Sequence, residues 1–157
     1  MLVQELFDLF EGTADAVFTV TDQGEICSWN EAAERICDFG KAEALQQSCQ
    51  SLLQGRGPLG VQVWGDNCSI RDYVTRHLEI PNFDLEVKIC SALQIWVSLS
   101  TLVYENPRNH RRLVVHFDHD ITERKKNEEL LRKMTNLSTI GQHSGRCCAS
   151  RTRVPVL

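Results

Sequence analysis

The second half of the chain contains three consecutive segments whose hydrophobicity follows the period of a β-strand. In residues 83–89 the apolar side chains occupy odd positions and the charged ones even positions, which predicts a strand with one wet face. Segment 95–104 continues this pattern, and 112–117 predicts a third strand after the polar turn at 105–110. Three strands joined by short turns predict an antiparallel meander.

The first half predicts a hairpin and several short helices. Residues 16–21 and 26–29 are apolar or β-branched runs around a glycine turn, which is typical of a β-hairpin. Asn30 precedes an acidic, alanine-containing stretch and is expected to cap a helix there. The Gly/Pro-rich stretch 55–60 predicts a loop, neither helix nor central strand. Segments 1–12, 41–47 and 69–77 have the spacing of short helices.

The chain is expected to leave the meander through a charged helix. Asp118 to Thr122 is expected to break the last strand, and the helix should run from Glu123 to about Leu137. Within it Leu130, Met134 and Leu137 repeat like a short coiled-coil seam.

Two runs give this order of elements a family resemblance. AVFTVTDQGEICSWNEAAE at 16–34 resembles the opening hairpin and first helix of a PAS domain, and HDITERK at 119–125 resembles the element that ends bacterial PAS domains. The resemblance covers about residues 4–137 and points to the N-terminal part of a sensor histidine kinase. It implies an α+β fold: a five-stranded antiparallel sheet with short helices over one face, a lead-in helix and a C-terminal signalling helix.

The expected organisation has four parts. These are an N-terminal amphipathic helix at 1–12, a PAS sensor domain at 13–119, a signalling helix or coiled-coil linker at 120–141, and an atypical basic tail without regular structure at 142–157. Residues 136–142 resemble the stretch ahead of a kinase phosphoacceptor box. His143 lacks the acid and the apolar helix that should follow, so no phosphoacceptor role is assigned to it. One hypothesis is that the tail is the frameshifted or truncated end of a kinase.

Charge and motifs exclude several function classes. The net charge is −4, and all acidic residues precede position 130, so the body lacks the basic stripe that nucleic-acid binding needs. No apolar run approaches the length of a membrane span, and the N-terminus does not resemble a secretory signal, so we expect a cytoplasmic protein. A phosphate loop or nucleophile motif is also missing, so we expect no enzymatic activity.

The resemblance implies a module that senses a small molecule or redox state and passes it through the exiting helix to a two-component output. Asp120, Thr122 and Glu123 can cap that helix and are the predicted transmission residues. A homodimer through the terminal helices is expected. The alternatives are a ligand-free dimerisation or interaction module and a kinase remnant without output. The predicted cavity residues are Phe18, Ile36, Leu45, Leu52, Tyr73, Val97 and Val115.

The cysteines leave the cofactor open. Cys49 and Cys68 flank the Gly/Pro stretch and are candidates for a redox pair, for metal ligands or for plain buried thiols, with the last favoured in a reducing compartment. An iron–sulfur site needs more thiols than this pair supplies. The sequence around Cys49 lacks the asparagine and arginine of flavin-binding relatives. His77 is the candidate haem ligand, but a histidine at a helix end is more often a dipole contact.

Overall fold

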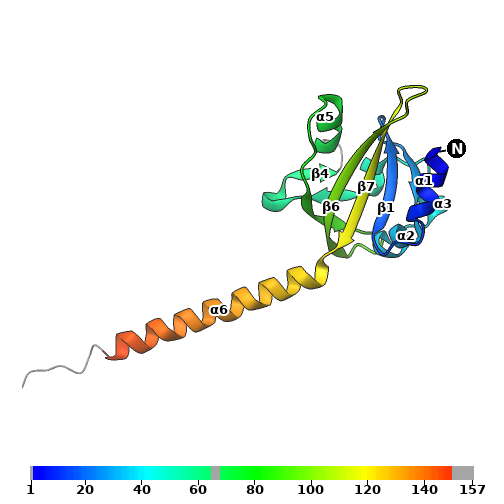
Figure 1. The fold of residues 1–157 in the computed structure, drawn as a ribbon. Helices are drawn as coiled ribbons and strands as arrows, with labels where there is room; N and C mark the ends of the chain where they lie inside the picture. The colour runs from blue at the N-terminus through cyan, green and yellow to red at the C-terminus, as the bar shows by residue number, and fades with distance from the viewer. Residues whose placement is uncertain (1, 65–67, 150–157) are drawn as a thin grey trace, which may run out of the picture. The chain divides into compact units, whose positions relative to one another are not determined.

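The computed structural model describes residues 2–64 and 68–149. The chain divides into two units, residues 1–122 and residues 123–157. The first unit is built on one antiparallel sheet of seven strands in the order β2-β1-β7-β6-β5-β3-β4 (Figure 1). The strands are β1 (Ala16–Thr21), β2 (Ile26–Trp29), β3 (Gln54–Arg56), β4 (Gln62–Trp64), β5 (Phe83–Lys88), β6 (Gln94–Glu105) and β7 (Arg112–Asp120).

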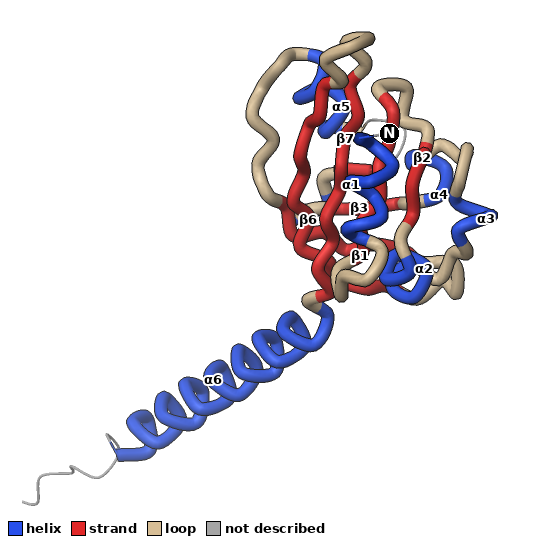
Figure 2. Tube along the Cα trace, turned by 45° about the vertical axis from the view of Figure 1, so that its right-hand side comes forward, coloured by secondary structure: helices blue, strands red, loops and turns tan. Residues whose placement is uncertain are grey.

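The helices of the first unit are short. They are α1 (Leu2–Phe10), α2 (Glu31–Cys37), α3 (Lys41–Ala44), α4 (Cys49–Leu52), the 3-10 turn η1 (Pro58–Gly60) and α5 (Ser69–Thr75). Buried residues of α2 to α5 share one core with the inner face of the sheet, whereas α1 lies across β1 and β7 on the outer face (Figure 2). The ring of Phe10 in α1 meets Phe117 edge to face at 5.3 Å. Helix α1 therefore covers part of the outer face of β1 and β7, while Leu102 of β6 remains 53 % exposed.

The predicted meander and hairpin are confirmed. Leu85, Val97 and Leu99 are almost fully buried on the inner face, as the alternation in β5 and β6 predicts. Gly24, at the turn between β1 and β2, has a φ of 86°, a left-handed conformation that costs glycine little. The Asn30 side chain accepts a hydrogen bond from the Ala33 backbone at 2.8 Å and thus caps α2.

The sheet has two strands more than expected, because β3 begins the Gly/Pro stretch and β4 directly follows it. A Cβ on Gly55 would lie 2.9 Å from the Trp64 ring, so this glycine makes room for the indole across the β3–β4 pair. The glycine that suggests a loop instead allows close packing in a strand.

The last strand also continues further than expected. Asp118 does not end β7, which pairs with β6 as far as Asp120. The backbone hydrogen bonds to β1 and β6 outweigh the local preference of aspartate for turns.

In the second unit, α6 (Thr122–Ala149) continues past the boundary expected at residue 141. The side chains of Leu130, Leu131, Met134 and Leu137 are exposed by 58 to 69 %. The helix carries the ion pairs Lys126–Glu123 and Lys133–Glu129, three and four residues apart. Residues 150–157 of the expected tail lie outside the described residues, as do the side chains from 139 onward.

Candidate functional site

The inner face of the sheet holds a partly open cavity of about 210 Å³. This volume is below the roughly 300–1,000 Å³ of sites for drug-sized ligands, so the cavity suits a smaller molecule. Strand β7 supplies three of the lining residues, and α5 with the residue before it supplies five. The lining residues are Val20, Thr21, Asp22, Gln23, Gly24, Cys49, Gln50, Trp64, Cys68, Ile70, Arg71, Val74, Thr75, Arg112, Val114 and His116.

His116 is the most deeply buried polar group of this wall. Its ring stacks on Phe18 with centroids 4.8 Å apart and meets the edge of Trp64 at 5.9 Å. Its Nδ1 lies 3.5 Å from the hydroxyl of Thr101 on the neighbouring strand. Burial lowers the pKa of His116 to about 3, so the imidazole is neutral at physiological pH and offers one donor and one acceptor.

Two arginines contribute positive charge to the cavity. Arg112 donates a hydrogen bond to the Val74 carbonyl at 2.8 Å, which links β7 to α5. Arg71 lies on the exposed side of α5, and Asp22 in the hairpin turn carries the opposite charge. The cavity thus combines an apolar wall with a polar rim.

Both candidate thiols line this cavity. Cys49 is the first residue of α4 and is 6 % exposed, whereas Cys68 directly precedes α5 and is half-buried. Burial, and secondly the charge of Cys68, raises the pKa of Cys49 to about 11. Among the described residues, the His, Cys, Asp and Glu side chains form no group of three or more that could hold a metal ion.

The seven residues predicted to line the cavity lie elsewhere. Phe18 and Val97 are buried in the core, and Ile36 and Leu52 pack against it. Leu45 lines a second cavity beside α1, and the Tyr73 ring lies 6.4 Å from that of Phe83. The prediction that Val115 lines the cavity is wrong, because Val115 occupies the opposite face of β7 from Val114 and His116.

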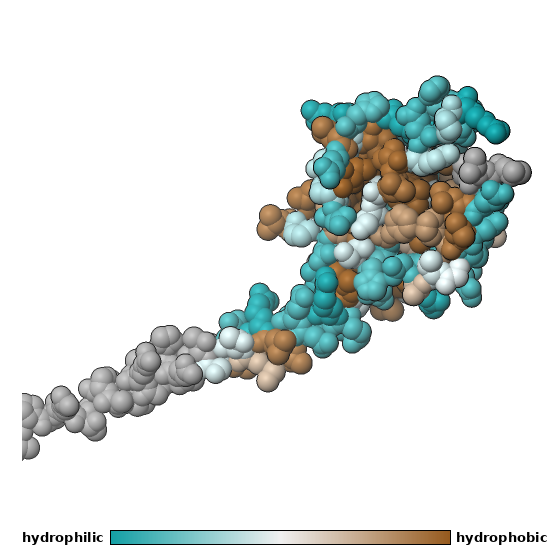
Figure 3. Space-filling view, in the orientation of Figure 1, coloured by the Kyte–Doolittle hydropathy of each residue, from teal (hydrophilic) through white to brown (hydrophobic). Residues whose placement is uncertain are grey.

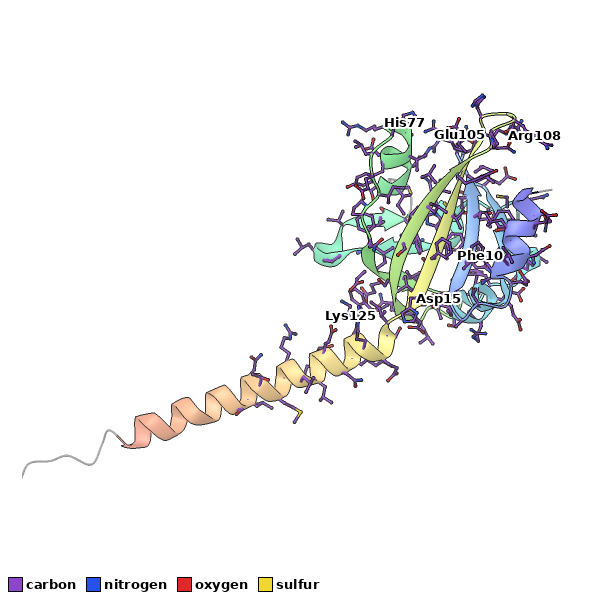
Figure 4. All side chains as sticks on the ribbon, in the orientation of Figure 1. Phe10, Asp15, His77, Glu105, Arg108 and Lys125 are labelled. Carbon is purple, nitrogen blue, oxygen red and sulfur yellow. The ribbon has the colours of Figure 1, made fainter. Side chains whose placement is uncertain are left out.

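His77 does not line the cavity, although it lies beside Arg112, which does. It follows α5 with a φ of 54° and lies 3.5 Å from Arg112 through its Nδ1. Figure 4 shows it near the β6–β7 turn, with Glu105 and Arg108, at the far end of the domain from Asp15. The sequence-based prediction missed the cavity residues His116 and Arg112. Both belong to β7, whose hydrophobic pattern does not reveal which of its faces is the inner one.

The predicted transmission residues meet at the end of β7. The Asp120 carboxylate accepts a hydrogen bond from the Thr122 backbone at 2.9 Å. The hydroxyl of Thr122 accepts one from the Trp96 backbone at 3.0 Å, so it binds β6 and does not cap the helix as expected. Glu123 begins the second unit and pairs with Lys126 at 3.4 Å.

The comparisons with known proteins agree with this fold. A family model described as "PAS domain" matches residues 14–123, so the chain belongs to the PAS domain family. The chain resembles the crystal structure of a PAS domain from Colwellia psychrerythraea, with 18 % identity, 78 % of this chain and 99 % of that chain covered, and a TM-score of 0.59.

Two further similar structures are the PAS domain of a nitrogen regulation protein and a histidine kinase. The PAS domain of nitrogen regulation protein NR(II) from Vibrio parahaemolyticus is 13 % identical, with 74 % of this chain and 97 % of that chain covered and a TM-score of 0.57. Histidine kinase ThkA, solved in complex with response regulator TrrA, is 22 % identical with a TM-score of 0.61; 91 % of this chain and 39 % of that chain are covered. No curated protein sequence matches the chain.

The helices of the described segments differ from a membrane span in length or in apolar character. Within residues 2–64 and 68–149, none combines the length and the apolar character that crossing a bilayer requires.

Proposed function

We propose that this PAS domain binds a small molecule in the inner-face cavity and passes its occupancy through residues 120–122 into α6, toward a two-component output. The observation that carries the proposal is the course of β7. The strand lines the cavity with Arg112, Val114 and His116, and it ends at Asp120. A ligand that shifts this strand would therefore act on the junction directly.

The lining suggests the chemistry of the ligand. Trp64, Ile70 and Val74 offer an apolar wall, while Arg112 and the neutral imidazole of His116 offer hydrogen bonds. A compact molecule with an apolar body and one acceptor or anionic group would use both. In this proposal the cavity residues act by binding alone, and the chain has no catalytic role.

The binding part is tested with two valines that follow one another on β7. Val114→Phe adds a ring to the cavity, whereas Val115→Phe adds the same ring to the outer face. We expect native mass spectrometry of freshly purified protein to find a bound small molecule that is lost only in Val114→Phe. Equal occupancy in both variants, or an empty wild-type protein after exposure to cell extract, would count against a ligand sensor.

The output part is tested at the junction. In a fusion of residues 1–137 to a histidine kinase, Asp120→Ala and Thr122→Val should make autophosphorylation independent of the ligand. Asp120→Asn and Thr122→Ser retain the oxygen acceptors and serve as matched controls. Unchanged ligand response in Asp120→Ala and Thr122→Val would contradict transmission through this junction. The family likeness to ThkA, which binds a response regulator, supports this choice of output.

A second candidate function is a dimerisation module, favoured by unpartnered apolar surface in both units. On the first unit, apolar side chains gather over β6 and β7 (Figure 3), where Leu102 is 53 % exposed. On α6, Leu130 and Met134 project from one stripe. Sedimentation equilibrium should find a dimer that Leu130→Lys with Met134→Lys weakens, whereas Lys133→Ala does not. A monomeric wild-type chain would reject this function.

A further inference from the structure

The cavity wall brings together two thiols from separate parts of the chain. Cys49 begins α4, Cys68 precedes α5, and the β3–β4 pair lies between them in sequence. Both residues line the same cavity. The two thiols are also close enough for the charge of Cys68 to raise the pKa of Cys49. The other cysteines with described side chains, Cys27, Cys37 and Cys90, do not line this cavity.

The two thiols differ in access to solvent. Cys68 is half-buried, while Cys49 is only 6 % exposed, and both line the partly open cavity. Burial raises the pKa of Cys49, so this thiol holds its proton at neutral pH and reacts slowly with a dissolved oxidant. An oxidant that enters the cavity therefore meets Cys68 first, with Cys49 waiting as an internal second thiol.

We propose that Cys68 and Cys49 are a hydroperoxide-sensitive thiol pair that closes reversibly into a disulfide at the cavity wall. The Cys68 sulfur attacks one peroxide oxygen, which yields a Cys68 sulfenic acid and releases water from hydrogen peroxide. The Cys49 sulfur then displaces the hydroxyl from the Cys68 sulfur and releases a second water. Two thiols lose two electrons and two protons, and the peroxide is reduced to two waters. A dithiol reductant restores both thiols by exchange.

The bond would change the cavity itself. It would join the start of α4 to the residue before α5, two elements of the wall that the β3–β4 pair separates in sequence. The consequence for ligand entry rests on the proposed sensory function, but the formation of the bond does not. The oxidised pair would thus regulate the same site that binds the ligand.

The test uses the full chain, reduced, freed of reductant and treated with hydrogen peroxide. Free thiols are then alkylated, and peptides are mapped by mass spectrometry. We expect a cross-linked peptide containing Cys49 and Cys68, lighter by two hydrogens and lost on treatment with dithiothreitol. The double variant Cys27→Ser with Cys90→Ser is the matched control and should form the cross-link at the wild-type rate.

Two single variants separate the two roles. Cys49→Ala should leave a Cys68 sulfenic acid that dimedone traps, and Cys68→Ser should slow oxidation of Cys49 at least tenfold. Because Cys49 is buried, circular dichroism and a thermal melt accompany each variant, and Cys49→Ser serves as a second replacement. Oxidation of wild-type Cys68 to sulfinic acid without a Cys49 cross-link would overturn the proposal, as would preferential cross-links to Cys27 or Cys90.

The experiment is independent of the sensory function. The cross-link is measured by mass without ligand or kinase, whereas ligand sensing is measured by occupancy and autophosphorylation. A cross-link in a protein that binds no ligand would support the thiol pair and reject the sensor. Ligand binding without a cross-link would do the reverse.

Discussion

Two ionisable side chains on the inner face of β7, His116 and Asp118, are equally buried but differ in their surroundings. His116 lies at the cavity, stacked on Phe18 and near the Thr101 hydroxyl. Asp118 lies two residues toward the junction, 1 % exposed, and neither of its carboxyl oxygens has a hydrogen-bond partner among the described residues. One end of the strand is stabilised by packing, while the other contains a polar group without compensation.

Burial shifts the pKa values of the two groups in opposite directions, and both groups are neutral as a result. Burial lowers the pKa of the His116 imidazole, so it loses its proton. Burial, and secondly the charge of Asp15, raises the pKa of Asp118 well above its ordinary range, so it keeps its proton. The folded domain therefore avoids a charge at either position. Burial of the unpaired Asp118 carboxyl therefore lowers the stability of the junction end of β7, and burial of His116 has no such effect at the cavity end.

The largest expected effect comes from the packing around His116. Phe18→Ala removes the ring that stacks on His116 and that also contacts Trp29 and Trp64. We expect a loss of about 3–5 kcal/mol in the free energy of unfolding, measured by urea denaturation. Phe117→Ala, on the half-buried outer face, is the matched control and should lose less. An equal loss in both would remove the contrast between the two faces.

The next effect is a pH profile in which the two groups act in opposite directions. The His116 contribution is fully present above its unfolded pKa of 6.5 and is lost as pH falls toward 3. The Asp118 contribution is fully present below its unfolded pKa of 3.8 and is lost as pH rises. As long as Asp118 keeps its proton in the folded state, that state carries one proton on Asp118, while the unfolded state carries one on histidine. Above about pH 4 the two contributions therefore change stability in opposite directions and partly cancel, and above about pH 6.5 only the Asp118 contribution can still lower it.

Single variants should separate the two opposing dependences of stability on pH. In Asp118→Asn only His116 remains, so stability should rise from pH 4 to 6.5 by about 1.4 kcal/mol per pH unit. In His116→Phe only Asp118 remains, so stability should fall as the pH rises above about 4. Urea midpoints at five pH values measure both. Parallel profiles for the two variants would mean that the two ends of β7 do not differ in this way.

At neutral pH, a substitution can remove the free-energy cost of burying the Asp118 carboxyl. Asp118→Val places an apolar, β-branched side chain of similar size in the same strand position. We expect the free energy of unfolding to rise by about 1–3 kcal/mol, because an unsatisfied buried polar group is lost. Asp22→Val, at an exposed position of the hairpin turn, is the control and should bring no such gain. A loss of stability in Asp118→Val would show that the carboxyl has a compensating interaction.

Strand periodicity explains which parts of this fold could be predicted. In β5 and β6 one face is wet, so alternation identifies Leu85 and Val97 as inner residues. In β7 both faces are covered, and the apolar run at 113–117 loses its period. Alternation cannot decide there between Val115 and His116 for the cavity. The cavity also gathers side chains from the hairpin turn, α4, β4, α5 and β7, and their meeting depends on tertiary packing that no local pattern contains.

Asp118 shows a second limit of the same reasoning. Local propensity favours a strand end at an aspartate, because its side chain competes for backbone hydrogen bonds. Pairing of β7 with β1 through Ala16 and with β6 through Leu99 overrides that propensity. The result is a buried carboxyl that no single-sequence rule would place in a core. By contrast, the HDITERK run predicted the junction correctly as the place where strand becomes helix.

The smallest expected effect concerns the hydrogen bonds that close the junction. The Thr122 hydroxyl accepts from the Trp96 backbone N–H at 3.0 Å and donates to the Trp96 carbonyl at 3.4 Å. Thr122→Val keeps the shape but removes both bonds, and should lower the free energy of unfolding by about 1 kcal/mol. Thr122→Ser should retain most of it.

Hydrogen exchange tells where that loss is felt. Since the cavity end of β7 is stabilised by packing, Thr122→Val should speed exchange of the Trp96 and Ile121 amides while leaving that of Val114 unchanged. The Ile121 amide donates to the same Trp96 carbonyl, so it reports directly on the junction. Faster exchange along the whole strand would instead mean that β7 opens as one unit. In that case the unpartnered carboxyl of Asp118 would weaken the cavity as much as the junction, and the two ends could not be regulated separately.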